Sequence, residues 1–308
     1  MTSEEVWGQS SPSPCNLMRK LQSLPNPNFL IIGSKKSGST LLYEMLGEHP
    51  EIWLPEEKEP GYFIDPDWQR PECWEAYRKL FRSAPAEATW IGEASTGYTT
   101  APHNGNTPER IRERLGRPKL IYILRDPVKR AISNFEHSFL HGFYPADITL
   151  AEAIANDRIL IDTSCYAMQL DAYAAVFGDD AVHVVIFEEL LREPRLVLEA
   201  AAKYLELSPE DHEWPDALPT VNSGRQNAVS VQVDGLLGQG LMRRLARKVP
   251  ISVKELVRSR LPGVQREIPA ATEQDIAALT QGVAEDLVQL HERLGPRIDL
   301  WPTVTRLS

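Results

Sequence analysis

The sequence predicts an α/β protein: a three-layer sandwich with a central parallel sheet and a phosphate-binding loop like that of P-loop proteins. Three observations support this fold class. Apolar strand-like runs alternate with helical segments along the chain, the pattern of a parallel sheet covered by helices on both faces. The run from Lys119 to Leu124 is continuously apolar apart from its first residue, as expected of a buried strand. The first strand leads through a Gly/Ser-rich turn into a helix, which makes an anion site at the helix N-terminus.

The elements follow in order along the chain. Five runs are expected to be strands or short extended pieces: 29–32, 51–54, 89–92, 119–124 and 182–187. Helices are expected over 41–46, 74–81, 108–115, 127–141, 150–156, 166–177, 194–205 and 273–294. Pro127 suits the first position of its helix, because proline fixes φ and its missing N–H has no partner there. Segment 215–234 is expected to be a long functional loop, and 236–260 is amphipathic and basic.

Length and composition set the domain organisation and limit the partners. Residues 1–25 are expected to be a flexible tail, and 26–308 a single domain. The formal net charge of −10 argues against nucleic acid, heparin-like polymers or an anionic membrane as the main partner. The three cysteines are far apart, and the sequence has no signal peptide or apolar stretch of membrane-spanning length. A reducing cytoplasm is therefore the expected location.

The loop after the first strand has its lysines in an unusual place. The spacing from Gly33 to Gly38 matches a nucleotide P-loop, but Ser39 stands where that motif requires lysine. The basic residues Lys35 and Lys36 precede the second glycine instead. This displacement argues against a P-loop kinase or nucleoside triphosphatase, which needs a lysine on the β- and γ-phosphates and a hydroxyl on Mg²⁺.

Two more strand ends carry polar side chains. In an open parallel sheet, ligands bind at the carboxyl ends of the strands. Arg125 follows the 119–124 strand, and Ser133 lies about two turns along the next helix on the same side. A guanidinium and a hydroxyl so placed suit a second phosphate. The alternative is that Arg125 pairs with Asp126 or another acid and that Ser133 is an ordinary helix residue.

The two loops together resemble the signature loops of sulfotransferases. The first is Lys36-Ser-Gly38-Ser39-Thr40, and the second runs from Arg125-Asp-Pro127 through Arg130 to Ser133. The resemblance is nearest to the bacterial and heparan-type branch, and it extends from about Asn28 to Trp301. It implies transfer of a sulfuryl group from 3′-phosphoadenosine 5′-phosphosulfate (PAPS), with adenosine 3′,5′-bisphosphate as the product.

The resemblance also implies roles for the loop residues. Lys36 would stabilise the leaving oxygen as the S–O bond breaks, whereas Lys35 is expected to be solvated. Arg125 and Ser133 would hold the 3′-phosphate, and no metal is required. The late segment 222–225 resembles a closing loop over that phosphate, which makes Arg225 a candidate contact. The 5′-phosphate would lie on the N–H groups of the first loop: Ser37, Gly38, Ser39 and Thr40.

Acceptor activation needs a base, and two candidates remain open. Glu59 matches the catalytic glutamate of heparan-type members, in a pattern like E-x-x-[FY]-F. His137 lies one helical turn after Ser133 and would face the same cleft. The acceptor side would be lined by residues near Glu59 and at the end of the 89–92 strand: Lys58, Tyr62, Glu93, Ser95 and Thr96.

The preferred acceptor is a small, neutral or cationic molecule such as a secondary metabolite, because the net charge opposes a long polyanion. Two other functions are compatible with a phosphate-binding loop. One is a P-loop kinase or NTPase-like phosphotransferase. The other is a non-catalytic nucleotide-binding protein, against which the presence of both Lys36 and Glu59 speaks.

Overall fold

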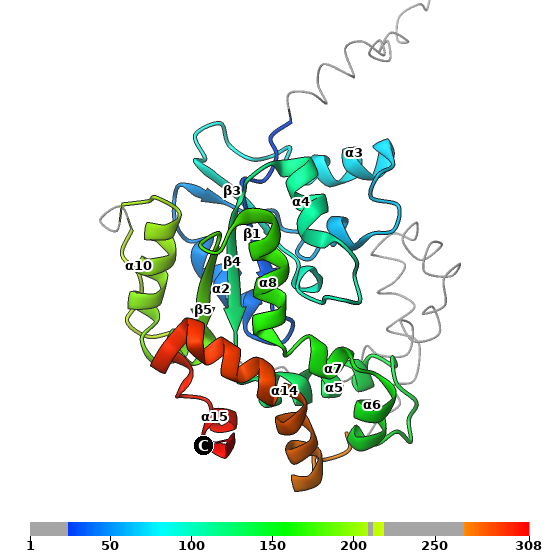
Figure 1. Cartoon of the computed structure of the whole chain (residues 1–308). Helices are drawn as coiled ribbons and strands as arrows, with labels where there is room; N and C mark the ends of the chain where they lie inside the picture. The colour runs from blue at the N-terminus through cyan, green and yellow to red at the C-terminus, as the bar shows by residue number, and fades with distance from the viewer. Residues whose placement is uncertain (1–23, 209–211, 219–267, 308) are drawn as a thin grey trace, which may run out of the picture.

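A five-stranded parallel sheet lies at the centre of the structure, a computed structural model that describes residues 24–208, 212–218 and 268–307 (Figure 1). Its strand order is β2-β3-β1-β4-β5, and each adjacent pair is parallel. The predicted parallel sheet is confirmed. The strands are β1 (Phe29–Gly33), β2 (Ile52–Trp53), β3 (Trp90–Ala94), β4 (Lys119–Leu124) and β5 (Val182–Ile186).

Helices cover both faces of this sheet. The α-helices are α2 (Ser39–Leu46), α3 (Pro71–Lys79), α4 (Thr107–Leu115), α5 (Pro127–Leu140), α6 (Leu150–Asn156), α7 (Ile159–Asp162), α8 (Tyr166–Phe177), α9 (Phe187–Arg192), α10 (Pro194–Tyr204), α14 (Glu273–Leu294) and α15 (Pro302–Leu307). Short 3₁₀ turns are η1 (Tyr62–Ile64), η2 (Thr96–Tyr98) and η4 (Gly295–Ile298).

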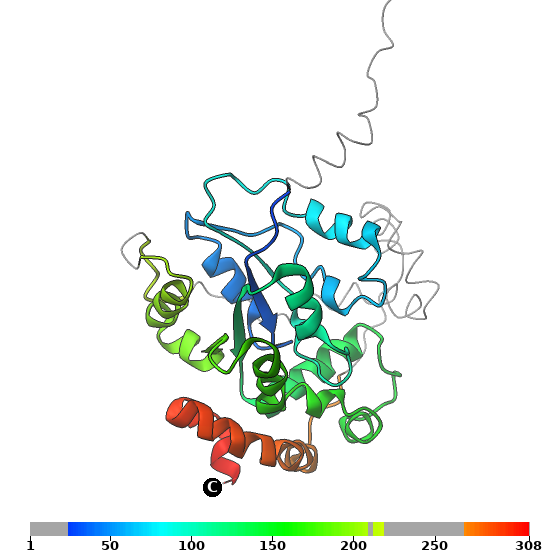
Figure 2. The ribbon, with the colours of Figure 1, turned by 45° about the horizontal axis from the view of Figure 1, so that its top comes forward.

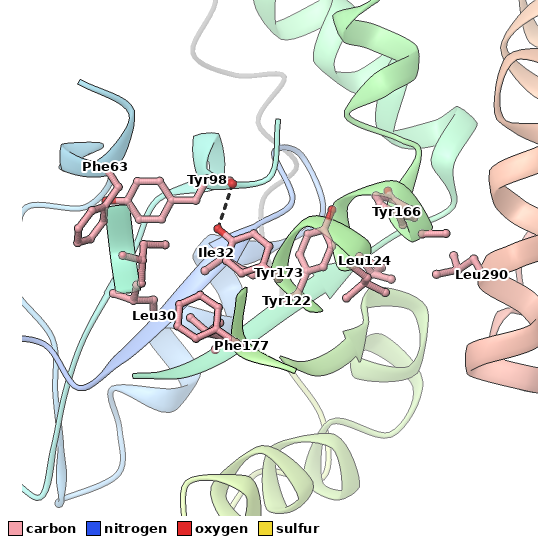
Figure 3. Packing of buried hydrophobic residues seen from close by; sticks show 14 of the residues in the cluster. Leu30, Ile32, Phe63, Tyr98, Tyr122, Leu124, Tyr166, Tyr173, Phe177 and Leu290 are labelled. Carbon is pink, nitrogen blue, oxygen red and sulfur yellow. Dashed lines mark hydrogen bonds between the residues drawn. The ribbon is translucent and has the colours of Figure 1, made fainter. Parts of the chain in front are cut away.

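Side chains alternate between the two faces along the central strands, which creates one core on each face. Leu30 and Ile32 of β1 pack with α8 on one face, where Tyr173 donates a hydrogen bond to the carbonyl of Tyr98 at 3.0 Å (Figure 3). Phe29 and Ile31 belong to the opposite core, together with residues of α2 and α10. Because a strand's side chains alternate in direction, the apolar runs serve both cores, and the predicted three-layer sandwich is confirmed.

The C-terminal elements pack beside the helices that follow β4. In both views α14 lies against α8 and α5 (Figure 2). A third apolar cluster forms there, with members from α5, α6, α7 and α14. No helix among the described residues is long and apolar enough to cross a membrane.

Most predicted elements are confirmed, with several differences. Helix α3 begins at Pro71 rather than Trp74, since proline occupies its first turn. Phe187 begins α9 instead of ending β5. The short helices α7, α9 and α15 were not predicted. The basic stretch 236–260, Arg225 and almost all of the predicted tail and late loop lie outside the described residues.

Candidate active site

The first loop joins β1 to α2 and places an uncapped helix N-terminus at the carboxyl edge of the sheet. Gly38 adopts a φ of 89°, and no side chain caps α2. A Cβ at Gly38 would lie 2.4 Å from the ring of Phe187, so only glycine fits there. Lys36 also has a left-handed φ, at 69°. The first-turn N–H groups of α2 therefore remain available to an anion, as the sequence predicted.

The second loop contacts the first through Arg125. Its Nη1 donates a hydrogen bond to the carbonyl of Lys36 at 3.1 Å, and its guanidinium lies 5.4 Å from the ring centroid of Phe187. Among the described residues Arg125 forms no ion pair, so the alternative pairing with Asp126 is not found. Ser133 lies two turns along α5 and is partly buried. The arrangement brings the two predicted phosphate loops together.

The segment that carries Glu59 lies against the start of α2. Lys58 Nζ is 2.7 Å from Thr40 Oγ1 and 3.3 Å from Ser39 Oγ, and it is 3.7 Å from Glu59 Oε1. Thr96 donates a hydrogen bond to Glu59 Oε2 at 3.1 Å. The Glu59 side chain is 50% exposed, so this carboxylate is both oriented and accessible.

The backbone at Glu59 is unusual in the same way as that at Lys36. Glu59 has a φ of 59° and precedes a proline. Its amide donates a hydrogen bond to the carbonyl of Ala94 at 3.0 Å, which anchors the segment at the end of β3. Only three non-glycine residues in the described chain have positive φ, and two of them are Lys36 and Glu59. Such conformations are unfavourable and gather at functional sites.

Positive charge surrounds Glu59. Burial lowers the pKa of Lys35, Lys36 and Lys58, whereas the charge of Glu59 raises it in each case. For Lys36 the neighbouring Arg125 lowers the pKa further. Lys35 is partly buried and close enough to Glu59 to interact with it electrostatically, so it belongs to this cluster rather than to the solvated surface. The cluster is suited to a polyanionic ligand.

His137 is held in its neutral form near the lysines. Burial, and then the charge of Lys36, lowers the pKa of His137 to about 3. Its ring stacks on that of His141 with centroids 4.0 Å apart, and its Nδ1 has no hydrogen-bond partner among the described residues. A neutral imidazole can accept a proton, but Nδ1 is buried and the lowered pKa makes this ring a weak base. The structure therefore leaves both Glu59 and His137 as candidate bases.

Glu93 lies beneath the Glu59 segment and is fully buried. Its Oε1 accepts hydrogen bonds from Tyr98 at 2.8 Å and Tyr77 at 3.2 Å, and its Oε2 accepts one from Ser95 at 2.9 Å. Ser95 Oγ in turn accepts a hydrogen bond from the amide of Gly61 at 3.0 Å. Burial raises the pKa of Glu93 to about 7.

Four predicted acceptor contacts require revision. Glu93 and Ser95 are at most 1% exposed, and their hydrogen bonds support the Glu59 segment from below. Thr96 is 3% exposed and orients Glu59 itself. Tyr62 packs in the core, stacked on Tyr77 and donating its hydroxyl to the carbonyl of Trp68. Because these four side chains are buried, they support the surrounding structure and do not line an open acceptor site. Of the predicted acceptor contacts, only Lys58 reaches Ser39 and Thr40 of the first loop.

Two aromatic residues support the second loop at this site, and sequence reasoning missed Phe187. Phe187 packs against both Gly38 and Arg125, and Tyr166 donates its hydroxyl to the carbonyl of Arg125 at 2.8 Å. Tyr166 is fully buried. Phe187 directly follows β5, the last strand. Ligands bind at the carboxyl ends of parallel strands, so that position alone makes Phe187 a candidate site residue.

Comparison with known proteins adds independent information. A family model described as "Sulfotransferase family" matches residues 27–211, more than half of the chain. The mouse heparan sulfate glucosamine 3-O-sulfotransferase 5 is 27% identical over 212 residues, which cover 66% of this chain and 59% of that protein. The mouse bifunctional heparan sulfate N-deacetylase/N-sulfotransferase 4 is 28% identical over 212 residues, covering 62% of this chain and 23% of that protein. The match thus spans less than two thirds of the length of each of these relatives.

A solved structure has the same fold. The crystal structure of a sulfotransferase from Alicyclobacillus acidocaldarius superimposes with a TM-score of 0.60 at 22% identity. The match covers 88% of this chain and 96% of that one. At this identity the likeness establishes the fold alone.

Proposed function

We propose, from the premise that this chain belongs to the sulfotransferase family, that its donor is PAPS and its acceptor a hydroxyl or amine of a small molecule. One observation carries the proposal: Lys36, Lys58 and Glu59 meet at the uncapped start of α2, and Arg125 bonds to the carbonyl of Lys36. The two loops therefore present a pair of neighbouring anion sites. PAPS carries phosphates on its 5′ and 3′ sides, which matches this pair.

Each loop has a proposed task in binding the donor. The N–H groups of Ser37 to Thr40 bind the 5′-phosphate, with the helix dipole favouring the negative charge. Arg125 and Ser133 bind the 3′-phosphate, for which a guanidinium offers paired donors. Lys58 contacts the hydroxyls of Ser39 and Thr40 and is placed to bind the sulfuryl oxygens.

The transfer itself needs two protein groups. The acceptor oxygen or nitrogen attacks sulfur, its bond to sulfur forms, and the bond from sulfur to the bridging oxygen of the phosphate breaks. Glu59 takes the acceptor's proton, or His137 does so as the second candidate. Lys36 stabilises the charge on the leaving oxygen, and its lowered pKa makes it a better proton donor to that oxygen. Adenosine 3′,5′-bisphosphate leaves as the product.

For the acceptor, net charge and local charge point in different directions. The net charge of −10 opposes the approach of a long polyanion, which favours a small neutral or cationic acceptor such as a secondary metabolite. The lysine cluster around Glu59 favours an anionic sugar as the second candidate, and two relatives are named for heparan sulfate. We prefer the small acceptor, because the phosphates of PAPS would already neutralise the positive charge of the lysine cluster.

The location proposed for this reaction is the cytoplasm. Cys73 and Cys165 are free cysteines. Free thiols in a chain with so few cysteines are typical of a reducing compartment. Fusion to a fluorescent reporter followed by cell fractionation would test the location.

A binding measurement tests the donor, and an activity panel tests the acceptor. Adenosine 3′,5′-bisphosphate should raise the melting temperature more than ATP or adenosine 5′-phosphate does at equal concentration. Stabilisation selective for ATP would contradict the proposal and favour a phosphotransferase. Labelled PAPS should then be incubated with alcohols, phenols, amines and a heparan oligosaccharide, since only a true acceptor class will take up the label.

The role of Lys36 needs its own variant. Lys36→Ala should lower kcat about 10²- to 10³-fold, as for loss of one transition-state charge contact, while the bisphosphate still binds. Lys129→Ala is a matched control, because Lys129 is an exposed lysine of the second loop. Full activity in Lys36→Ala would refute the proposed role and leave the binding site intact.

A further inference from the structure

The residue after Arg125 is a buried acid that bonds to a residue near the far end of the described chain. Asp126 is 1% exposed. Its Oδ1 accepts hydrogen bonds from the amide of Lys129 at 2.9 Å and from Thr303 Oγ1 at 3.0 Å. Its Oδ2 accepts one from the amide of Thr303 at 3.0 Å. Asp126 therefore caps α5 and holds Thr303, which is 177 positions away in sequence.

A second acid ties the same two regions together. Glu188 accepts a hydrogen bond from the amide of Asp126 at 3.1 Å through Oε1 and from the indole of Trp301 at 2.8 Å through Oε2. Trp301 is fully buried. Glu189, the residue after Glu188, forms a 2.7 Å ion pair with Arg297. Two adjacent glutamates thus fix segment 297–303 to α9, and one of them, Glu188, also bonds to the second loop.

These contacts surround the backbone of Arg125 without engaging its guanidinium. The carbonyl of Arg125 accepts a hydrogen bond from Tyr166, whose ring lies 5.9 Å from that of Trp301. The next amide, that of Asp126, is held by Glu188. The guanidinium instead reaches across to the carbonyl of Lys36. The C-terminal segment can therefore set the direction of this side chain while leaving its remaining donors to a ligand.

We propose that segment 297–303 positions Arg125 for the 3′-phosphate of the donor, with Thr303 as the positioning residue. The inference rests on the proposed function, because it assigns Arg125 to that phosphate. A bidentate guanidinium contact depends strongly on geometry. Loosening the Asp126–Thr303 contact moves the start of the second loop and lowers the affinity of Arg125 for the 3′-phosphate. The 5′-phosphate site on α2 lies on the other loop and keeps its affinity.

The test compares two nucleotides that differ only in the 3′-phosphate. Thr303→Val removes the hydroxyl donor to Asp126 and keeps the side-chain shape. Its dissociation constant for adenosine 3′,5′-bisphosphate should rise about fivefold, a modest coupling between sites, whereas that for adenosine 5′-phosphate should stay within about twofold. Thr303→Ser keeps the hydroxyl and should restore the bisphosphate affinity. Thr305→Val, at an exposed position of α15, controls for a change in that helix.

Two outcomes separate this inference from the function on which it rests. If the unmodified protein binds both nucleotides equally, the assignment of Arg125 to the 3′-phosphate fails. If it prefers the bisphosphate but Thr303→Val weakens both nucleotides in equal proportion, Thr303 has a general structural role and the positioning inference is overturned. If Thr303→Val does not fold, Trp301→Phe, which removes the indole donor to Glu188 and leaves a smaller ring in the core, must show the same selective loss.

Discussion

Replacing Glu93 by glutamine should change how stability depends on pH. Burial raises the pKa of this carboxyl from 4.5 to about 7 in the folded protein. Folded chains therefore retain a proton on Glu93 between pH 4.5 and 7 that unfolded chains have lost. Since folding then binds a proton, the stabilising contribution of this group is complete below pH 4.5 and is lost as the pH rises through about 7.

The magnitude follows from the same two values. One pKa unit corresponds to about 1.4 kcal/mol, so the loss between pH 4.5 and 7 amounts to roughly 3 kcal/mol. That is a large part of the total stability of an ordinary domain. Glutamine has nearly the same shape but does not titrate. The free energy of unfolding of the Glu93→Gln variant should consequently show a flatter dependence on pH than that of the unmodified protein.

Urea unfolding at pH 5, 6, 7 and 8 provides the measurement. The free energy of unfolding of the unmodified protein, minus that of Glu93→Gln, should fall by about 2 kcal/mol from pH 5 to pH 7 and then level off. Glu57→Gln controls for the removal of one negative charge, because Glu57 is exposed on the segment that carries Glu59. A difference that stays constant over this range would refute the reasoning that burial keeps Glu93 protonated.

Three further predictions concern the loops and the bases. Gly38→Ala should abolish stabilisation by adenosine 3′,5′-bisphosphate, since its Cβ would lie 2.4 Å from Phe187; Gly47→Ala, at the other end of α2 with a φ of −67°, should retain it in the same thermal-shift assay. Glu59→Gln should lower kcat about 10²- to 10⁴-fold, as expected for loss of a general base, with the bisphosphate affinity unchanged; an unchanged kcat would leave His137 as the base. Because the pKa of His137 is lowered to about 3, the imidazole is neutral from pH 5 to 8, and His137→Gln should alter the rate but not the shape of the kcat/KM profile over that range. Disappearance of an acidic limb near pH 6.5 in that variant would show that the imidazole titrates normally.

Much of the fold could be predicted because its signals are local. The apolar run 119–124 coincides with β4, and the helices 150–156, 166–177 and 273–294 match α6, α8 and α14. Phe187 was assigned to the wrong element because an aromatic residue suits a strand as well as a helix start. Helix α15 was missed since its six residues are too few to show a helical period.

The candidate site was predictable in outline and not in its supporting contacts. Spacing and strand ends identified both loops, because those follow from chain order. The burial of Glu93 and the placement of Lys58 on the start of α2 depend on how β3 and the Glu59 segment pack, and no local pattern reports that. The hydrogen bonds of Asp126 to Thr303 span 177 positions and have no sequence signature at all.

The left-handed backbone at Lys36 and Glu59 has a consequence for engineering this protein. Glycine adopts such φ values without a steric penalty, so a search for stabilising substitutions would select glycine at both positions. Relief of an unfavourable conformation can contribute about 1 kcal/mol at each site. Each such change would also delete a proposed catalytic group, the leaving-group lysine or the base. Stability and catalysis are therefore in direct competition at these two positions, and a thermostable redesign should keep both residues and seek its gains elsewhere.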